Sequence, residues 1–88
     1  MRISQAELSR RLELASQQIT VGGTYSHFKQ PQAMYKVLHL AVNEADDVIC
    51  VVYQAQYGDH LIFVRPLESW QQRIKRNDQT VDRFLRCD

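Results

Sequence analysis

The first twenty residues follow the apolar and polar pattern of an amphipathic helix. Apolar residues recur at intervals of four, three and four, which places them on one helix face: Leu8, Leu12, Ala15 and Ile19. Ser4 and Glu7 have the spacing of a capping box, in which each side chain accepts a hydrogen bond from the backbone amide of the other. We therefore predict an amphipathic helix over residues 4–20, which ends before the turn-forming pair Gly22–Gly23.

Beyond the glycine pair, the pattern is that of β-strands. Residues 24–28 are rich in β-forming side chains, and residues 29–32 have the composition of a loop. Residues 48–55 form a β-branched run that is apolar on both faces, as in a central strand. A turn at residues 57–60 leads into the apolar segment 61–65, so these two strands are predicted to form a hairpin.

The rest of the chain contains one further predicted hairpin and one ambiguous segment. Pro66 lacks an amide hydrogen and is predicted to end the preceding strand. Residues 73–76 and 80–86 then flank the turn residues 77–79, which predicts a second hairpin. Residues 33–42 fit a helical stripe as well as a strand, and periodicity does not decide between the two.

Length and composition fit one small folded domain. The chain has 88 residues, of which 44% are hydrophobic and 24% charged, unlike the polar, highly charged composition of disordered chains. A chain of this length can build a single core. We predict one domain over residues 1–88, with the helix at 4–20 and a β domain at 22–86.

The same composition predicts a cytoplasmic protein without a membrane partner. The longest apolar stretches, residues 37–42 and 48–53, are far shorter than the roughly 20 residues of a membrane span. Charged side chains interrupt the N-terminal segment, where a secretion signal would be apolar. Cys50 and Cys87 form no CxxC pair and are expected to be free thiols in a reducing compartment. The net charge of +1 argues against whole-molecule attraction to nucleic acid, although residues 65–86 are mildly basic.

Several blocks of residues point to a family. They are Gly23–Lys29, Tyr35–Val37, Val51–Asp59, Val64–Trp70 and Arg83–Phe84. Through their order and spacing, residues 22–85 resemble a bacterial domain family of unknown function. The resemblance implies a compact β domain in which residues 35–42 are extended, and it implies no known reaction. The predicted fold class is therefore mainly β (α+β): a small SH3-like or partly open antiparallel β-barrel of about five strands, preceded by the helix.

Polar side chains on the first predicted strand offer one candidate site. Tyr25, His27 and Lys29 alternate onto one face, where a hydroxyl, an imidazole and a cation could contact a ligand. The structural alternative is that Tyr25 packs in the interior, His27 bonds a backbone carbonyl and Lys29 points to water. Arg65, before the proline corner, is a planar donor for a carboxylate or phosphate, or else it pairs with Glu68.

The other aromatic side chains have two interpretations. They are Tyr53, Tyr57, Phe63, Trp70 and Phe84. Rings of this kind stack on bases in small barrels that bind single strands. A domain of this length also needs aromatic rings in its core, and we predict core positions for most of the set. Tyr57, which lies beside the predicted turn, is the expected exception.

Catalytic and metal-binding motifs are weak. The three histidines and Cys50 lie on separate predicted elements, without the close ligand pairs of zinc sites. The chain has no nucleophile elbow, phosphate loop or zinc-protease helix. We therefore expect no metal and no cofactor, and an enzyme is not the leading hypothesis.

The function predicted from these residues is that of a non-enzymatic binding module. In this hypothesis Tyr25, His27, Tyr57 and Arg65 line a patch for an anionic or planar ligand, namely a nucleotide, RNA or a peptide. A second hypothesis is an accessory subunit that docks on a partner protein through the N-terminal helix. A third is an enzyme that uses His27 as general base. The chain is expected to be a monomer or a small homo-oligomer.

Overall fold

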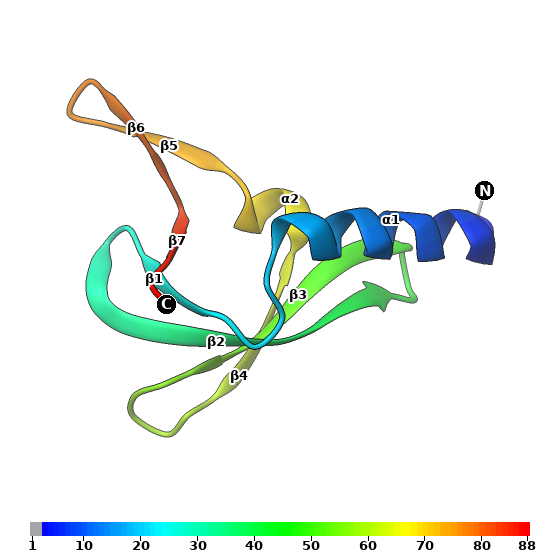
Figure 1. Ribbon diagram of the computed structural model, residues 1–88, viewed down its shortest axis with the longest axis horizontal. Helices are drawn as coiled ribbons and strands as arrows, with labels where there is room; N and C mark the ends of the chain where they lie inside the picture. Colours follow the sequence, from blue (N-terminus) through cyan, green and yellow to red (C-terminus); the bar gives the residue numbers. More distant parts are fainter. Residues whose placement is uncertain (1–2) are drawn as a thin grey trace.

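A long helix lies across a five-stranded antiparallel sheet in the computed structural model, which describes residues 3–88 (Figure 1). The elements are α1 (Gln5–Gln18), β1 (Thr24–His27), β2 (Gln30–Asn43), β3 (Val48–Ala55), β4 (Ile62–Pro66), α2 (Leu67–Trp70), β5 (Arg73–Arg76), β6 (Gln79–Asp82) and β7 (Phe84–Arg86). The large sheet has the order β4-β3-β2-β1-β7, and β5 and β6 form a separate two-stranded sheet. The mainly β, α+β class predicted from the sequence is confirmed. The large sheet is open, with β4 and β7 at its edges, and does not close into a barrel.

The start of α1 follows half of the predicted capping box. The Ser4 hydroxyl accepts a hydrogen bond from the Glu7 amide at 3.2 Å, which satisfies one of the free amides of the first turn. The Glu7 carboxylate accepts instead from the guanidinium groups of Arg10 and Arg11. The return bond to the Ser4 amide is therefore replaced by ion pairs along the helix surface, at spacings of three and four residues.

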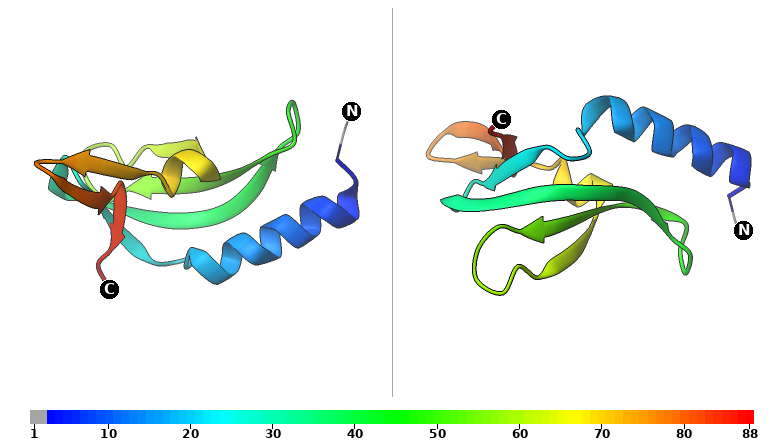
Figure 2. Two further views of the ribbon diagram at one scale, coloured as in Figure 1. Left: turned by 90° about the horizontal axis from the view of Figure 1, so that it is seen from above. Right: turned by 60° about the horizontal axis from the view of Figure 1, so that its bottom comes forward.

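The apolar stripe of α1 lies against the sheet. Ala15 and Ile19 are buried, Leu8 and Leu12 are half-buried, and the helix contacts β2 and β3 (Figure 2). The apolar stripe predicted from the sequence is thus the face of the helix that packs within the chain. Among the described residues, neither helix reaches the length and hydropathy that a bilayer span requires.

The ambiguous segment is a strand, and it begins earlier than predicted. β2 starts at Gln30, so the prediction of a loop over residues 29–32 was wrong, and only Phe28 and Lys29 separate it from β1. The pairing of β1 with β2 shifts between Ser26 and His27, which leaves residues 31–33 in an irregular stretch of the ladder. A proline is tolerated there because its missing amide removes no regular ladder bond.

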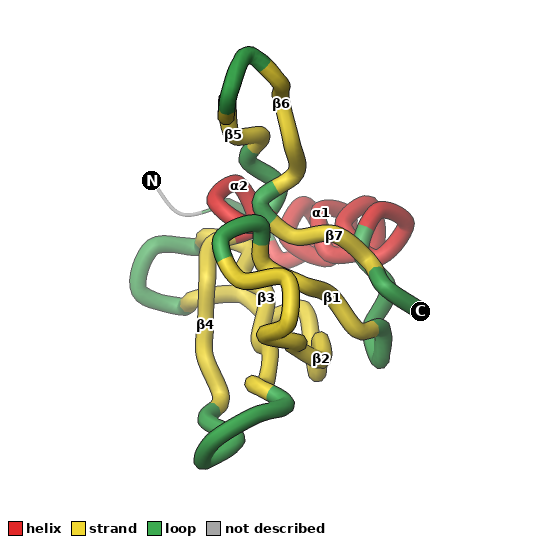
Figure 3. Tube along the Cα trace, turned by 90° about the vertical axis from the view of Figure 1, so that its left-hand side faces the viewer, coloured by secondary structure: helices red, strands yellow, loops and turns green. Residues whose placement is uncertain are grey.

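The two predicted hairpins form, but the second ends early. β3 and β4 pair as expected, and Pro66 is the last residue of β4, opposite Cys50. In the second hairpin Asn77 and Asp78 both have positive φ, which suits a tight two-residue turn. The strand predicted over residues 80–86 is broken: β6 ends at Asp82, and β7 leaves the hairpin to pair with β1. Figure 3 shows the β5–β6 hairpin projecting beyond the large sheet.

The core is aromatic, and it joins segments that are distant in sequence. Its buried cluster consists of Ile19, Tyr25, Val37, Val51, Tyr53, Trp70 and Phe84. The Trp70 and Phe84 rings stack with their centres 3.8 Å apart and their planes at 4°. The prediction of core positions is confirmed for Tyr53, Trp70 and Phe84 and was wrong for Phe63, which is 38% exposed. Tyr57 is exposed, as predicted.

We expect the substitution Phe84→Ala to destabilise the fold by about 3–5 kcal/mol, because it empties a buried site and removes the partner of Trp70. Urea unfolding followed by Trp70 fluorescence measures this loss. Leu85→Ala is the matched control, since Leu85 is the next residue and is exposed; its cost should stay within about 0.5 kcal/mol. Equal costs for the two variants would contradict the assignment of Phe84 to the core.

Candidate functional site

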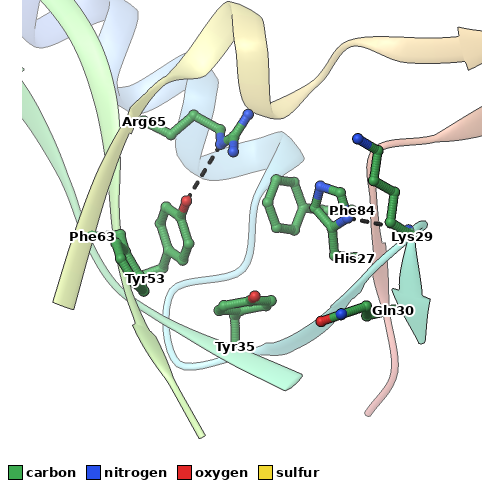
Figure 4. Close-up of a pocket in the computed structure, with 8 residues that line it drawn as sticks. All are labelled: His27, Lys29, Gln30, Tyr35, Tyr53, Phe63, Arg65 and Phe84. Carbon is green, nitrogen blue, oxygen red and sulfur yellow. Dashed lines mark hydrogen bonds between the residues drawn. The ribbon is translucent and has the colours of Figure 1, made fainter. Parts of the chain in front are cut away.

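A pocket of about 370 Å³ opens between β1, the start of β2, the strands β3 and β4, and β7 (Figure 4). Its lining combines four aromatic rings with three basic or imidazole side chains and one amide: Tyr35, Tyr53, Phe63, Phe84, His27, Lys29, Arg65 and Gln30. No aspartate or glutamate is among these residues. The four aromatic rings form the walls of the pocket. Most of its polar side-chain groups can donate hydrogen bonds.

Arg65 supplies a held cation at the upper wall of the pocket (Figure 4). Its Nε donates to the Tyr53 hydroxyl at 3.3 Å and its Nη1 donates to the Ser69 hydroxyl at 3.0 Å. The guanidinium carbon lies 5.3 Å from the centre of the Phe84 ring. The predicted alternative of a pair with Glu68 was wrong, because one turn of α2 brings Ser69 to the guanidinium instead. Both hydroxyl partners are neutral, so the charge keeps its capacity to bind an anion.

His27 faces the same pocket from the end of β1. Its Nδ1 accepts a hydrogen bond from the Lys29 amide at 3.1 Å, so the neutral ring carries its proton on Nε2. The structural alternative in which His27 bonds a backbone carbonyl was therefore wrong, since the ring accepts from an amide. Burial, and then the positive charges of Arg65, Arg83 and Lys29, lower the pKa of His27 below its ordinary value. At neutral pH His27 is thus a neutral donor and not a further cation.

Two tyrosines extend the pocket toward the β3–β4 turn. The hydroxyls of Tyr35, which lines the pocket, and Tyr57, which is exposed beside the turn, lie 2.7 Å apart. Burial and this hydrogen bond raise the pKa of Tyr35 to about 12, so the hydroxyl stays protonated at neutral pH. The Tyr35 ring also meets Tyr53 and Phe84 edge to face. Tyr57 therefore adjoins the site through Tyr35.

The structure brings together two of the four residues that the sequence analysis assigned to a patch. His27 and Arg65 line one pocket, and Tyr57 reaches its margin through Tyr35. Tyr25 lies in the core: its ring packs on Trp70, its hydroxyl accepts from the Thr20 amide, and it does not line this pocket. This position matches the structural alternative, because the inner face of β1 turns Tyr25 toward the interior of the chain.

Sequence reasoning missed the aromatic walls of the site. Tyr35 lay in the segment whose secondary structure was undecided, and Tyr53 and Phe84 were assigned to the core, where they also belong. Lys29 was predicted to share a strand face with His27. It lies instead in the turn after β1 but still lines the pocket. The missing signal was the pairing of β7 with β1, which brings Phe84 opposite His27.

The chemistry of the pocket is that of donors and rings. Among residues 3–88, no three His, Cys, Asp or Glu side chains gather in a way that could hold a metal ion. The charged groups that act on His27 are cations, and the pocket lining contains no carboxylate that could orient its ring as a general base. An arrangement of this kind can hold an anionic group against Arg65 and an aromatic or planar group against the rings.

The fold and site define a small α+β domain with an open antiparallel sheet and an aromatic, basic pocket. The chain belongs to the family described as protein of unknown function (DUF1653), whose model matches residues 23–86, and the resemblance found from the sequence is confirmed. A crystal structure of a DUF1653 protein from Bordetella bronchiseptica is similar to this chain, with a TM-score of 0.64 and 28% identity over 76% of this chain and 86% of that one. No curated protein matches the chain. The strands β1 and β4, which carry His27 and Arg65, lie inside the residues that match the family, whereas α1 precedes them.

The lowered pKa of His27 predicts a pH-dependent contribution to folding. In the folded chain protonation is disfavoured, so the stability that neutral His27 provides is complete above the unfolded pKa of about 6.5 and is lost as the pH falls below it. We expect His27→Asn, whose amide oxygen can still accept from the Lys29 amide, to flatten this dependence. Urea unfolding between about pH 7.5 and pH 5 measures the difference. An unchanged pH dependence in His27→Asn would contradict the prediction.

Proposed function

We propose that this domain is a binding module for a small planar anion of the nucleotide class, which it holds in the pocket between His27, Arg65 and the aromatic walls. The observation that carries the proposal is the guanidinium of Arg65, fixed by neutral hydroxyls inside an aromatic pocket that has no acidic side chain in its lining. Arg65 is half-buried and its two hydrogen-bond partners are neutral, so its charge is available to pair with an anion.

The positioning of Arg65 supports recognition of a phosphate or carboxylate. Tyr53 and Ser69 take up Nε and Nη1, so the orientation of the guanidinium is set before a ligand arrives. Donors that are held in place lose less conformational entropy on binding than free side chains do. Lys29 and the neutral Nε2–H of His27 add two donors on the opposite side of the pocket. The three donors together favour an anionic group with several acceptor oxygens.

The aromatic lining supports a planar group beside that anion. Tyr35, Tyr53 and Phe84 line the pocket and meet one another edge to face. Rings placed in this way bind bases and other planar groups with little regard to sequence, at about 1–3 kcal/mol for each stacked base. The volume of about 370 Å³ lies near the lower end of the range for small-molecule sites, which favours a mononucleotide over a long strand or a peptide.

The other two hypotheses receive less support. The stripe of α1 that could dock on a partner packs against β2 and β3, with Ala15 and Ile19 buried, so most of this helix face is used within the fold. The pocket lining has no carboxylate to orient the His27 ring as in a catalytic triad, and the charged groups that lower its pKa are all cationic. Binding without a reaction is the function that uses all of the features described above.

The decisive variant is Arg65→Met, which removes the charge and keeps the length of the side chain. We expect it to weaken the binding of a nucleoside monophosphate by about 10- to 100-fold, as for the loss of a hydrogen bond to a charged group. Titration of ¹⁵N-labelled protein with adenosine and guanosine monophosphates, each beside its uncharged nucleoside, measures the affinity. Shifts should cluster at His27, Tyr35, Tyr53 and Arg65, and the nucleosides should bind more weakly.

Two controls separate binding from folding. Arg10→Met removes an exposed guanidinium of α1 and should leave the affinity unchanged. Arg65→Lys keeps the charge without the planar fork, and an intermediate affinity is expected. Near-ultraviolet circular dichroism of Trp70 shows whether each variant keeps the core. The absence of clustered shifts with any of these nucleotides would refute the proposal.

A further inference from the structure

The β4 edge of the large sheet is apolar, exposed and unpaired. β4 ends the strand order, and no other strand of residues 3–88 lies along its outer side (Figure 3). Along this edge Leu61 is 58% exposed, Ile62 58% and Val64 63%. Between His60 and Arg65 the edge carries no charge and no proline. Proteins normally protect a free strand edge with such residues, because it is a template for pairing with another strand.

The pairing of β4 with β3 shows which backbone groups face outward. The two strands pair in a continuous register in which Val52 lies opposite Val64 and Gln54 lies opposite Ile62. In the same register the Ala55 amide donates to the Leu61 carbonyl at 2.9 Å. Hydrogen-bonded and non-hydrogen-bonded pairs alternate along an antiparallel ladder, so the odd-numbered residues of β4 bond to β3. The amides and carbonyls of Ile62 and Val64 therefore point away from the sheet.

The opposite edge is shorter and charged. β7 has only three residues, and Arg86 within it pairs with Asp88. The Cys87 amide donates to the Thr24 carbonyl, and the Thr24 amide donates to the Asp88 carboxylate, which ties the end of the chain to β1. The β7 edge is thus short and charged, as protected edges are. β4 is the edge of this sheet that is suited to a further strand.

We propose that a second copy of this chain pairs with β4, strand against strand and antiparallel, around a two-fold axis at Phe63. In this register Ile62 of each copy lies opposite Val64 of the other, and their outward amides and carbonyls form the new ladder bonds. The same uncharged segment then serves both copies, as a two-fold interface requires. Arg65 lies opposite Leu61 of the second copy, so like charges do not face each other.

The second copy is the occupant that fits the ends of this edge. Pro66 has no amide to offer at the outward position that follows Val64, and His60, with φ at 54°, leaves the extended conformation at the other end. Pairing is therefore confined to the few residues in which the edge is self-complementary. A longer peptide strand would meet the proline and the turn, whereas a second β4 ends at the same points. The two sheets together form one continuous sheet across the interface.

The dimer bonds and the pocket use different groups of β4. Phe63 and Arg65 point their side chains to the pocket face, and the new bonds involve only backbone groups of Ile62 and Val64. The inference is thus independent of the proposed ligand, and failure of one does not decide the other.

Sedimentation equilibrium of the full chain, with hydrogen exchange read by NMR, tests the proposal. We expect a mass of about twice 10.3 kDa that falls to the monomer mass on dilution. The amides of Ile62 and Val64 should be protected only where the dimer forms, while those of Phe63 and Arg65, which bond to β3, stay protected throughout. A monomer at every soluble concentration would overturn the proposal, and so would a dimer in which the Ile62 and Val64 amides exchange freely. Protection of those two amides in a monomer by an added extended peptide would assign the edge to that peptide and overturn it as well.

Variants of Val64 make the test specific to the edge. Val64→Pro removes an amide that points away from β3, so the intrachain ladder is kept and the dimer should be lost. Val64→Thr keeps the amide and the branched shape and should remain a dimer. Ile62→Lys places a charge on the edge and should also give a monomer, which covers the case that the proline variant misfolds. Leu85→Lys, on the opposite edge strand and 59% exposed, is the matched control and should stay dimeric. A dimeric Ile62→Lys or a monomeric Leu85→Lys would overturn the assignment to β4.

Discussion

The stack of Phe84 on Trp70 is the contact on which the rest of this structure depends. Trp70 ends the single turn of α2 and Phe84 begins β7, so their rings join the two segments that follow the β3–β4 hairpin. With Phe84 in place, β7 pairs with β1 and the large sheet has its fifth strand. An 88-residue chain has little apolar surface to bury, and an aromatic core gains much burial and many ring contacts from few residues. The same rings are therefore used for packing and for the walls of the pocket.

The composition of the pocket follows from this double use of the aromatic rings. Phe84 is buried on the Trp70 side and borders the pocket beside Arg65 and His27. Two hydroxyls hold the Arg65 guanidinium over the Phe84 ring and orient it without neutralising its charge. Burial of His27 is the largest cause of its lowered pKa, and the positive charge of Arg65 is the next, so both help to keep His27 uncharged. The pocket thus has one fixed cation, one neutral donor ring and one lysine in the turn after β1 rather than a diffuse basic surface. In the proposed function, this combination would select for the chemistry of a ligand more than for its total charge.

An open sheet has consequences that a closed barrel would avoid. Its two edges are treated differently: the chain end and an ion pair occupy the β7 side, whereas β4 presents apolar side chains and free backbone groups. The helix that precedes the family-matched region covers part of the sheet through Ala15 and Ile19 and leaves both edges free. The proposed ligand site and the proposed interface would therefore use different groups of the same strand: the side chains of Phe63 and Arg65 on one face of the sheet, and the outward backbone groups of Ile62 and Val64 in its plane.

Local residue patterns account for the Ser4 cap, the helical stripe, the β3–β4 hairpin, and the burial of Tyr53, Trp70 and Phe84. Each of these depends on neighbours within a few residues or on simple apolar character, which the sequence contains directly. The packing of the whole chain is needed to explain why β7 leaves its predicted hairpin to pair with β1, why residue 30 already belongs to a strand, why Ser69 rather than Glu68 holds Arg65, and why Tyr25 turns inward. These outcomes depend on contacts between residues up to about sixty positions apart, such as Tyr25 with Arg86. Local propensity carries no information about such pairings, because the free energy that selects them comes from burying one shared core.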